Sequence, residues 1–353
     1  MIPSAPDPVP TPTAPAPAVS MLRLLGGFQV SQALYVAARA RIADRLADGP
    51  RTVAELAEAA DLRPELLRRL LRTLAAEGVF GYDEPQDRVT LGPLGHTLRT
   101  GAPGSVRNVA LMWMETHYRP FAGLWQTLHD GIPAAQAELG MPFFDWLGKD
   151  PARIATFSGA MGDMMRTVRA DALAAVRLDG VRTLVDIGGA DGTALAELAL
   201  REPRLRGTVF DLPHVVAAAP ALLRDRGVAD RITTEGGDFF TAVPAGADCY
   251  LACFVLHDWN DAQALRILGR VHEAAAPDAR LLLVETVVGE GTPPEVATLL
   301  DLTMLGMLDG RERTRDDWRT LLADADFRLD RVLATGGPMC VVEATRMPRT
   351  ARV

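Results

Sequence analysis

The chain has 353 residues, is 48% hydrophobic and 23% charged, and carries a net charge of −8. This length predicts more than one domain, and the composition is that of a globular protein. The negative charge argues against general attraction to nucleic acid or anionic lipid. No apolar run reaches the ~18 residues of a membrane span, and the three cysteines show neither metal-type nor disulfide spacing. We therefore expect a cytoplasmic protein that binds neither membrane nor nucleic acid.

The first hundred residues predict a tail followed by a small helical domain. Residues 1–20 are rich in proline and lack basic residues, which predicts a disordered tail and argues against a secretory signal. From 21 to about 47, apolar residues recur at helical spacing. Helices are expected over 52–60, where Thr52 and Glu55 can form a capping box, and over 64–74. Residues 79–95 predict a hairpin, so 21–100 has the winged-helix pattern.

A winged helix raises the alternative of a DNA-binding regulator. Its expected recognition helix carries Arg68, Arg69 and Arg72. However, residues 21–100 hold 11 arginines against 10 acidic residues, whereas DNA-reading domains normally present a basic face. We therefore interpret the three arginines as a solvated helix face and the domain as one used for packing.

Residues 101–178 predict an all-helical region rich in methionine and aromatic residues. Core packing explains most of these side chains. Methionine also suits adaptable apolar binding surfaces, so a planar apolar substrate is a second interpretation. From 179 onward, strands expected at 183–188, 206–212, 232–238, 249–256 and 280–288 alternate with helices. This pattern predicts an α/β fold with a doubly wound parallel sheet. A terminal hairpin around Gly336 and Gly337 adds one antiparallel strand.

The segment TLVDIGGADGT, at 183–193, predicts a strand, a glycine turn and a helix. Asp211 ends the next strand, 23 residues after Gly188, where an acidic side chain can bind both ribose hydroxyls. The spacing fails the dinucleotide pattern G-x-G-x-x-G, because Ala190 and Thr193 occupy glycine positions. Asp191 would also repel a pyrophosphate. A nucleoside with a cationic centre and no phosphate fits better, and S-adenosylmethionine is such a molecule.

Five motifs together carry a family resemblance. VDIGGADGT, FDLP, GGDFF, FVLHDWND and GRERT occur in this order between 185 and 314. The chain resembles the S-adenosylmethionine-dependent O-methyltransferases of the plant caffeic acid and hydroxyindole type, with their bacterial secondary-metabolite relatives, over about 21–348. The resemblance implies a winged-helix dimerisation domain at 21–100, a helical linker and substrate-binding region at 101–178, and a Rossmann-like methyltransferase domain with a reversed last strand at 179–353. It also implies a homodimer.

The resemblance implies a role for each residue of the cofactor site. Gly188 would approach the methionine part of the cofactor through its backbone. Asp211, followed by Leu212 in FDLP, would bind the ribose hydroxyls. Asp238 would accept a hydrogen bond from the adenine amine, and Phe239 would lie beside the ring.

The implied catalytic residues are His257 as general base, with Glu285 and Glu312 flanking it. A phenol has a pKa near ~10, so a histidine that removes its proton during transfer contributes about 10²–10⁴ in rate. A carboxylate beside the ring would fix its tautomer and favour the imidazolium. No carboxylate and histidine spacing in the sequence indicates a metal site, so we expect metal-independent turnover.

Two departures from the plant pattern concern the cofactor. Cys253 stands where plant members have a lysine that helps to hold it, so the part played by that lysine is either absent or taken by another group. Met165 stands where they have a serine near the cofactor. Met161 and Met304 match positions that pack on the substrate ring. The candidate substrate-binding residues are Trp146, Phe157, Met161, Met165 and Met304.

The expected function is O-methylation of a hydroxyl, such as the phenol of an aromatic polyketide. C- or N-methylation and cofactor-assisted hydroxylation or rearrangement are alternatives on the same scaffold. A winged-helix regulator that senses S-adenosylmethionine is an alternative of another class. The substrate and the position of its hydroxyl are not encoded in these motifs.

Overall fold

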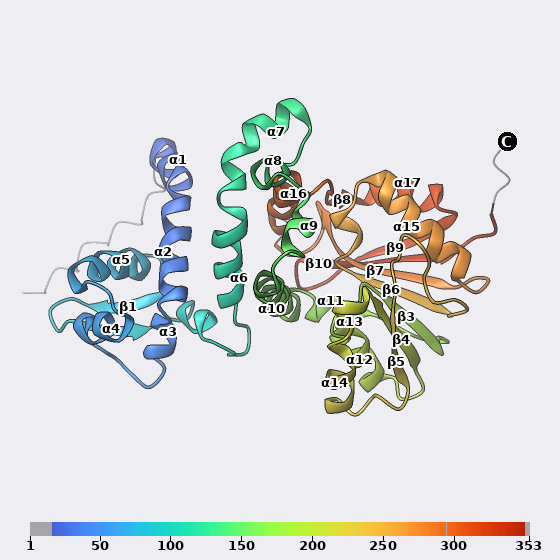
Figure 1. Ribbon diagram of the computed structural model, residues 1–353, viewed down its shortest axis with the longest axis horizontal. Coiled ribbons are helices and arrows are strands. Elements are labelled where there is room, and N and C mark those ends of the chain that lie inside the picture. The colour runs from blue at the N-terminus through green and yellow to red at the C-terminus, as the bar shows by residue number, and fades with distance from the viewer. Residues whose placement is uncertain (1–15, 294, 350–353) are drawn as a thin grey trace, which may run out of the picture. The chain divides into compact units, whose positions relative to one another are not determined.

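Residues 16–293 and 295–349 are described by the computed structural model (Figure 1). The chain divides into two units between Met114 and Glu115, and each is described by itself. The tail expected over 1–20 lies mostly outside the described residues. Its last part is predicted wrongly, because residues 17–20 belong to the first helix, which Pro17 begins.

The first unit is helical with one hairpin. Its elements are α1 (Pro17–Leu25), α2 (Gly27–Arg39), α3 (Ile42–Arg45), α4 (Val53–Ala60), α5 (Pro64–Ala76), β1 (Phe80–Asp83), β2 (Arg88–Leu91), η1 (Gly95–Leu98) and α6 (Arg107–Met112). The continuous helical pattern over 21–47 is broken at Gly26 and at Arg41, whose φ of 54° is left-handed. The capping box of Thr52 and Glu55 is confirmed at the start of α4.

The hairpin of this unit pairs with two of the three arginines of α5. Arg72 donates to both carboxylate oxygens of Glu84, at 2.7 and 2.9 Å. Arg68 donates to the Tyr82 hydroxyl and to Asp87. Two of the three arginines on the expected recognition helix are therefore paired with the hairpin, which agrees with a packing role for this helix.

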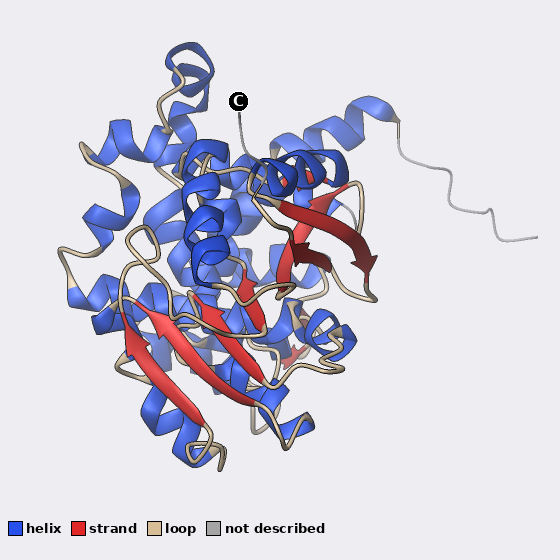
Figure 2. Cartoon of the chain, turned by 90° about the vertical axis from the view of Figure 1, so that its right-hand side faces the viewer, coloured by secondary structure: helices blue, strands red, loops and turns tan. Residues whose placement is uncertain are grey.

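The second unit contains helices around one large sheet (Figure 2). Its helices before the sheet begin with η2 (Trp113–His117), which spans the boundary, and continue with η3 (Pro120–Gly123), α7 (Leu124–Asp130), α8 (Ala134–Leu139), α9 (Phe143–Leu147), α10 (Pro151–Val168) and α11 (Ala170–Ala175). Those within and after the sheet are α12 (Thr193–Arg201), α13 (Pro213–Val216), α14 (Ala219–Asp225), η4 (Leu256–Asp258), α15 (Asp261–Ala274), α16 (Glu295–Met307) and α17 (Arg315–Asp324).

The sheet has the strand order β5-β4-β3-β6-β7-β10-β9, and the short β8 pairs with β7. Its strands are β3 (Thr183–Ile187), β4 (Arg206–Asp211), β5 (Ile232–Gly236), β6 (Cys249–Cys253), β7 (Arg280–Val288), β8 (Arg313–Thr314), β9 (Phe327–Ala334) and β10 (Met339–Arg346). The pairs among β3 to β7 are parallel, whereas β10 runs antiparallel to β7. The expected parallel sheet with a reversed last strand is confirmed.

Apolar side chains cover both faces of the sheet, so alternate residues of one strand enter different cores. Ile187 of β3 belongs to the same core as Leu268 of α15 and Trp318 of α17. Leu184 of the same strand packs with α12 through Leu195. The faces are thus filled, and the sites for ligands lie at the carboxyl edge of the parallel strands.

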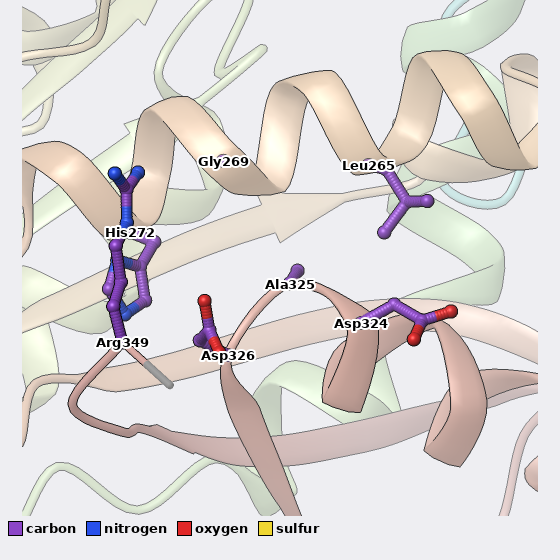
Figure 3. Close-up of a pocket in the computed structure, with 7 residues that line it drawn as sticks. All are labelled: Leu265, Gly269, His272, Asp324, Ala325, Asp326 and Arg349. Atoms are coloured by element: carbon purple, nitrogen blue, oxygen red, sulfur yellow. The ribbon is translucent and has the colours of Figure 1, made fainter. Parts of the chain in front are cut away.

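A surface pocket lies at the opposite edge (Figure 3). It is lined by Leu265, Gly269, His272, Asp324, Ala325, Asp326 and Arg349. The end of β10 marks this edge, because Thr345 pairs with Arg280 at the start of β7. The pocket is therefore separate from the edge that carries the sequence motifs.

Candidate active site

The glycine turn exposes backbone at the end of β3. Gly188 has a φ of +66°, and a Cβ there would lie 2.7 Å from a methyl group of Val255. The amide of Gly188 donates to the Phe210 carbonyl at 2.8 Å, which fixes the turn against β4. Only glycine meets both conditions at this position, so a ligand can approach the main chain closely here.

The expected nucleoside-binding residues follow β4 and β5 at the same edge. Asp211 accepts hydrogen bonds from the amides of Ala190 and Leu212, at 2.9 and 2.7 Å. Asp238 accepts from the Phe240 amide at 2.9 Å. The ring of Phe239 packs against Trp259. Leu212 is 43% exposed. Acidic side chains thus stand at the ends of two successive strands, next to the accessible main chain of the glycine turn. No lysine of the sequence is placed here to bind a phosphate. This combination fits S-adenosylmethionine.

The loop after β6 carries His257 and is held in an unusual conformation. Phe254 has a φ of 58°, which is strained for a bulky side chain. Its ring centroid lies 3.7 Å from that of His257. Glu285 Oε1 accepts the amides of Val255 and Leu256, at 3.1 and 2.8 Å. Glu285 thus holds the backbone of the loop, and one of its oxygens also lies within 4.8 Å of a His257 ring nitrogen, so it stands beside the imidazole as the family resemblance implied.

Arg313 ties the other end of this loop to β8. Its buried guanidinium donates to the carbonyls of Leu256 and Trp259 and to the carboxylate of Asp261. It also stacks over the Trp318 ring. His257 is therefore held on a loop that is fixed at both ends.

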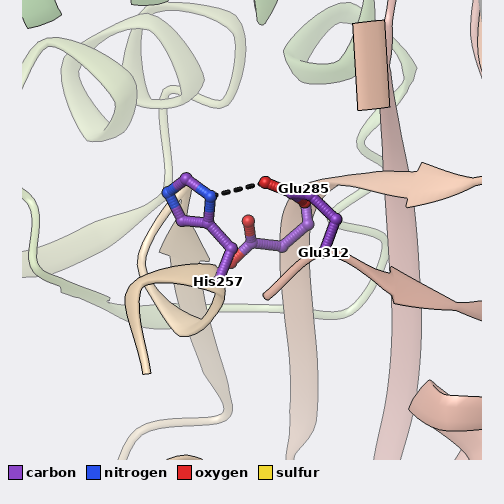
Figure 4. A group of neighbouring side chains, drawn as sticks. All are labelled: His257, Glu285 and Glu312. Carbon is purple, nitrogen blue, oxygen red and sulfur yellow. Dashed lines mark hydrogen bonds and ion pairs between the residues drawn. The ribbon is translucent and has the colours of Figure 1, made fainter. Parts of the chain in front are cut away.

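His257 is buried beside the carboxylates of Glu312 and Glu285 (Figure 4), and the carboxylate of Asp258 lies close to its other ring nitrogen. Its Nδ1 lies 2.7 Å from Glu312 Oε1, and its Nε2 lies 3.2 Å from Asp258 Oδ1. Glu312 is fixed in turn by the Thr286 hydroxyl, which donates to Oε2, and its own amide donates to Asp301. The structure thus brings together the three predicted catalytic residues and adds Asp258.

The charges of this cluster favour the imidazolium. Burial lowers the pKa of His257, but the carboxylates of Asp258, Glu312 and Glu285 more than offset it and raise this pKa to about 10. Burial raises the pKa of Glu285 to about 7 and that of Asp258 to about 6, against the opposing charge of His257. The site is built to stabilise a proton on the ring.

The same three side chains could hold a metal ion by geometry. One ligand atom from each of His257, Glu285 and Glu312 lies within 4.8 Å of the others. No spacing in the sequence indicated this cluster, because its members come from three separate segments. In the structure, however, the Glu312 and Glu285 oxygens already accept hydrogen bonds from His257 and from the loop amides.

The candidate substrate-binding residues fall into separate groups. Trp146 and Phe157 pack around Phe143, with ring centroids 6.1 and 5.9 Å from it. Met165 belongs to the apolar core beneath β3. Met304 on α16 is buried, and Met161 on α10 is half-buried. For all five residues, contact with a substrate stays a prediction.

Sequence reasoning missed Phe254 and the part played by Asp258. A left-handed φ at phenylalanine has no signature in the sequence. Asp258 had one, since it is adjacent to His257 in FVLHDWND, but helix entry explained it equally well.

Comparison with known proteins fixes the family. Residues 124–328 match the family model of an O-methyltransferase domain, and residues 22–101 match that of an O-methyltransferase dimerisation domain. The chain belongs to this O-methyltransferase family. The family resemblance carried by the five motifs is confirmed.

Three relatives show the range of chemistry around this chain. A phenazine O-methyltransferase of Lysobacter antibioticus is 39% identical over 92% of this chain and 95% of its own. An 8-amino-8-demethylriboflavin N,N-dimethyltransferase of Streptomyces davaonensis is 36% identical over 89% and 91%. An aclacinomycin 10-hydroxylase of Streptomyces purpurascens is 37% identical over 88% and 84%.

A solved structure identifies the cofactor of the fold. An O-methyltransferase from neocarzinostatin biosynthesis, in complex with S-adenosylmethionine and 2-hydroxy-5-methyl naphthoic acid, has a TM-score of 0.80 and 33% identity, covering 92% of this chain and 98% of its own. The present chain is an S-adenosylmethionine-dependent O-methyltransferase. Among the residues that the structure describes, no helix is long and apolar enough to cross a membrane.

Proposed function

We propose that this enzyme methylates a phenolic hydroxyl of an aromatic secondary metabolite, with His257 as general base and without a metal ion. The observation that carries the proposal is the short contact between His257 Nδ1 and Glu312 Oε1, 2.7 Å, in a buried site. It assigns Nδ1 to the Glu312 carboxylate, so the proton of the acceptor is exchanged at Nε2, which lies 3.2 Å from Asp258 Oδ1. Relatives named for phenazine, hydroxybenzoate and naphthoate acceptors support an aromatic one.

The chemistry divides between cofactor and protein. S-adenosylmethionine supplies a methyl group activated on a sulfonium sulfur. His257 takes the phenolic proton on Nε2, and Glu312 stabilises the resulting imidazolium through Nδ1. Because the neighbouring carboxylates raise the pKa of His257, its neutral ring accepts the proton of a phenol more readily than an ordinary imidazole does. Asp258, on the Nε2 side, must give way to the acceptor hydroxyl or receive the proton next.

The general-base role is tested with His257→Ala. We expect kcat/KM to fall by about 10²–10⁴, while the Kd for S-adenosylhomocysteine stays within a few-fold of wild type. His272→Ala is a matched control, because this buried histidine lies away from the carboxyl edge and bonds to the Met347 carbonyl. A wild-type rate in His257→Ala would remove the general-base role.

N-methylation is the second candidate, because one relative is an N,N-dimethyltransferase. The compound 3-amino-4-hydroxybenzoate offers an amine and a phenol on one ring, and 2,7-dihydroxy-5-methyl-1-naphthoate offers phenols alone. Incubation with methyl-labelled S-adenosylmethionine, followed by mass spectrometry of the products, separates the two activities. We expect the label on oxygen. Label on nitrogen, or on neither compound, counts against a phenolic acceptor.

Metal-independent turnover is tested by chelation. We expect dialysis against EDTA to leave the rate unchanged, because the candidate ligand atoms of Glu285 and Glu312 are committed to hydrogen bonds. Loss of activity that Mg²⁺ or Zn²⁺ restores would instead make the His257 cluster a metal site.

The regulator alternative has a separate test. We expect no specific gel shift with the DNA upstream of the gene, because Arg68 and Arg72 are engaged by the wing. Homodimer assembly and a cytoplasmic location stay predictions from the sequence.

A further inference from the structure

Phe254 begins the loop after β6 in a conformation that is unfavourable for its residue type. β6 ends at Cys253, and the Phe254 amide still donates to the Val284 carbonyl of β7 at 2.9 Å. The backbone then leaves the sheet at a φ of 58°. Glycine adopts this left-handed region without steric cost, whereas a bulky aromatic residue does not. Phenylalanine is therefore strained at this position, and its contacts have to offset the strain.

The surroundings of the loop hold this conformation in place. Glu285 accepts the amides of the next two residues, Val255 and Leu256, at 3.1 and 2.8 Å. A methyl group of Val255 lies so close to the glycine turn that a Cβ at Gly188 would approach it to 2.7 Å. The chain therefore cannot relax by turning the loop over, and the backbone fixes the direction of the Phe254 side chain.

The ring of Phe254 lies against the imidazole of His257. The two ring centroids are 3.7 Å apart, with an angle of 40° between the planes. His257 is buried, whereas Phe254 is half-buried. An aromatic side chain thus covers one face of the imidazole, while part of its own surface stays open toward the site.

Hydrogen bonds alone do not fix the plane of this imidazole during the reaction. Glu312 holds Nδ1 at 2.7 Å, and Asp258 lies 3.2 Å from Nε2. When an acceptor hydroxyl takes the place of Asp258 at Nε2, the ring keeps one hydrogen bond to the protein, about which it can swing. The contact with Phe254 then opposes this motion, because the phenyl ring occupies the space on one side of the imidazole.

We propose that Phe254 is a positioning residue for methyl transfer, whose ring fixes the plane of the His257 imidazole and directs Nε2 at the acceptor hydroxyl. The inference rests on the proposed function, in which His257 is the general base. Proton transfer requires the two heavy atoms at hydrogen-bond distance, and a misplacement of about 1 Å can lower a rate about 10²-fold. The imidazolium formed in the reaction also lies against the Phe254 ring, and an aromatic face attracts a cation.

The contact is tested first without an acceptor, by NMR spectroscopy of the full chain with S-adenosylhomocysteine bound and histidine isotope-labelled at Cε1. The spectrum of His257→Ala assigns the His257 signal among the six histidines. We expect Phe254→Leu to shift and broaden this signal, because the ring current is lost and the imidazole samples more than one orientation. The remaining histidine signals should stay in place. An unchanged His257 signal would overturn the proposal.

Steady-state kinetics then measure the consequence, with 2,7-dihydroxy-5-methyl-1-naphthoate as acceptor. Phe254→Leu should lower kcat by about 10–100-fold, while the KM for the acceptor and the Kd for S-adenosylhomocysteine stay within about three-fold. Phe254→Tyr keeps the aromatic ring and should retain most of the rate. Phe254→Gly adopts the left-handed conformation without strain but lacks the ring, so it should be as slow as Phe254→Leu.

Phe327→Leu is the matched control. This buried ring at the start of β9 lies edge-on to His272, with centroids 5.6 Å apart, away from the carboxyl edge. The control should leave kcat unchanged. A wild-type kcat in Phe254→Leu or in Phe254→Gly would contradict the role of the ring. A loss of S-adenosylhomocysteine binding as large as the loss of kcat would also contradict it, since Phe254 would then act on the cofactor.

A double-mutant cycle separates this inference from the proposed function. In the His257→Ala background, Phe254→Leu should change kcat by less than about two-fold, because the ring acts through the imidazole. A further loss of about 10-fold in that background would contradict this coupling. A wild-type rate in His257→Ala counts against the general base and leaves the NMR contact as expected. A slow His257→Ala with a wild-type rate in Phe254→Leu counts against Phe254 alone.

Discussion

The protonation state of His257 determines whether this residue can act as a general base. A general base must be neutral before it acts, yet the pKa of His257 is raised to about 10 by its carboxylate neighbours. The neutral form is therefore scarce at neutral pH, and it increases as the pH rises toward 10. What the protein gains is a strong base whose protonated form is well stabilised. We accordingly expect kcat/KM to rise with pH across the range from 7 to 10.

Glu312→Gln tests whether the negative charge of Glu312 raises the pKa of His257. The substitution removes one negative charge and weakens the bond to Nδ1, so the pKa of His257 falls. The acid limb of the profile of kcat/KM against pH should move to lower pH, while the plateau falls about 10–100-fold because the imidazolium loses a charged partner. Glu290→Gln makes the same charge change at a surface pair with Arg315 and should leave the limb in place. A limb that stays fixed or moves upward in Glu312→Gln contradicts the assigned charge coupling.

At the scale of elements, two loops must touch for the catalytic pair to form. The main chain of Gly310 packs directly against the loop that carries His257. The amide of Arg311 donates a hydrogen bond to the His257 carbonyl at 2.8 Å. A Cβ at Gly310 would meet that carbonyl oxygen at 2.0 Å. Because the atoms on both sides of this contact belong to the main chain, they cannot shift without a large cost in free energy. A side chain at position 310 would therefore push the two loops apart.

Gly310→Ala should therefore cost about 1–3 kcal/mol of unfolding free energy and lower kcat by lengthening the contact of His257 with Glu312. Urea denaturation and steady-state kinetics measure the two effects. The control is Gly269→Ala in α15, where a Cβ would meet nothing within 4 Å. That change should stabilise the protein by about 0.5–1 kcal/mol, since alanine favours a helix. Equal behaviour of the two variants would show that the close approach at Gly310 has no consequence.

At the scale of the whole molecule, the sequence predicted what depends on neighbours along the chain. Apolar runs ending in Gly188 or Asp211 predicted the strands and their carboxyl edge, and the Thr52 capping box predicted the start of α4. The breaks at Gly26 and Arg41 were missed, because the apolar pattern continues through them. The action of Glu285 on the loop backbone, and the pairing of His257 with Glu312, depend on contacts between distant segments. No periodicity carries that information.

Self-association is the last whole-molecule prediction, and α1 with the start of α2 supports it. Six large apolar side chains within ten residues are 54–75% exposed, namely Val19, Met21, Leu22, Leu24, Leu25 and Phe28. An apolar patch of this kind marks an interaction surface, and residues 22–101 match a dimerisation domain. We expect the chain to sediment as a dimer and the patch to be covered by a second copy.

The double variant Leu22→Asp with Leu25→Asp places two charges on this surface, so it should sediment as a monomer at micromolar concentration, because burying unpaired carboxylates is costly. Ser20→Asp is the matched control: it adds a charge at an exposed polar position of the same helix and should stay dimeric. Thermal unfolding separates lost assembly from lost folding, since the methyltransferase unit has its own cores. A wild-type chain that sediments as a monomer, or a double variant that remains dimeric, would show that α1 does not form the interface.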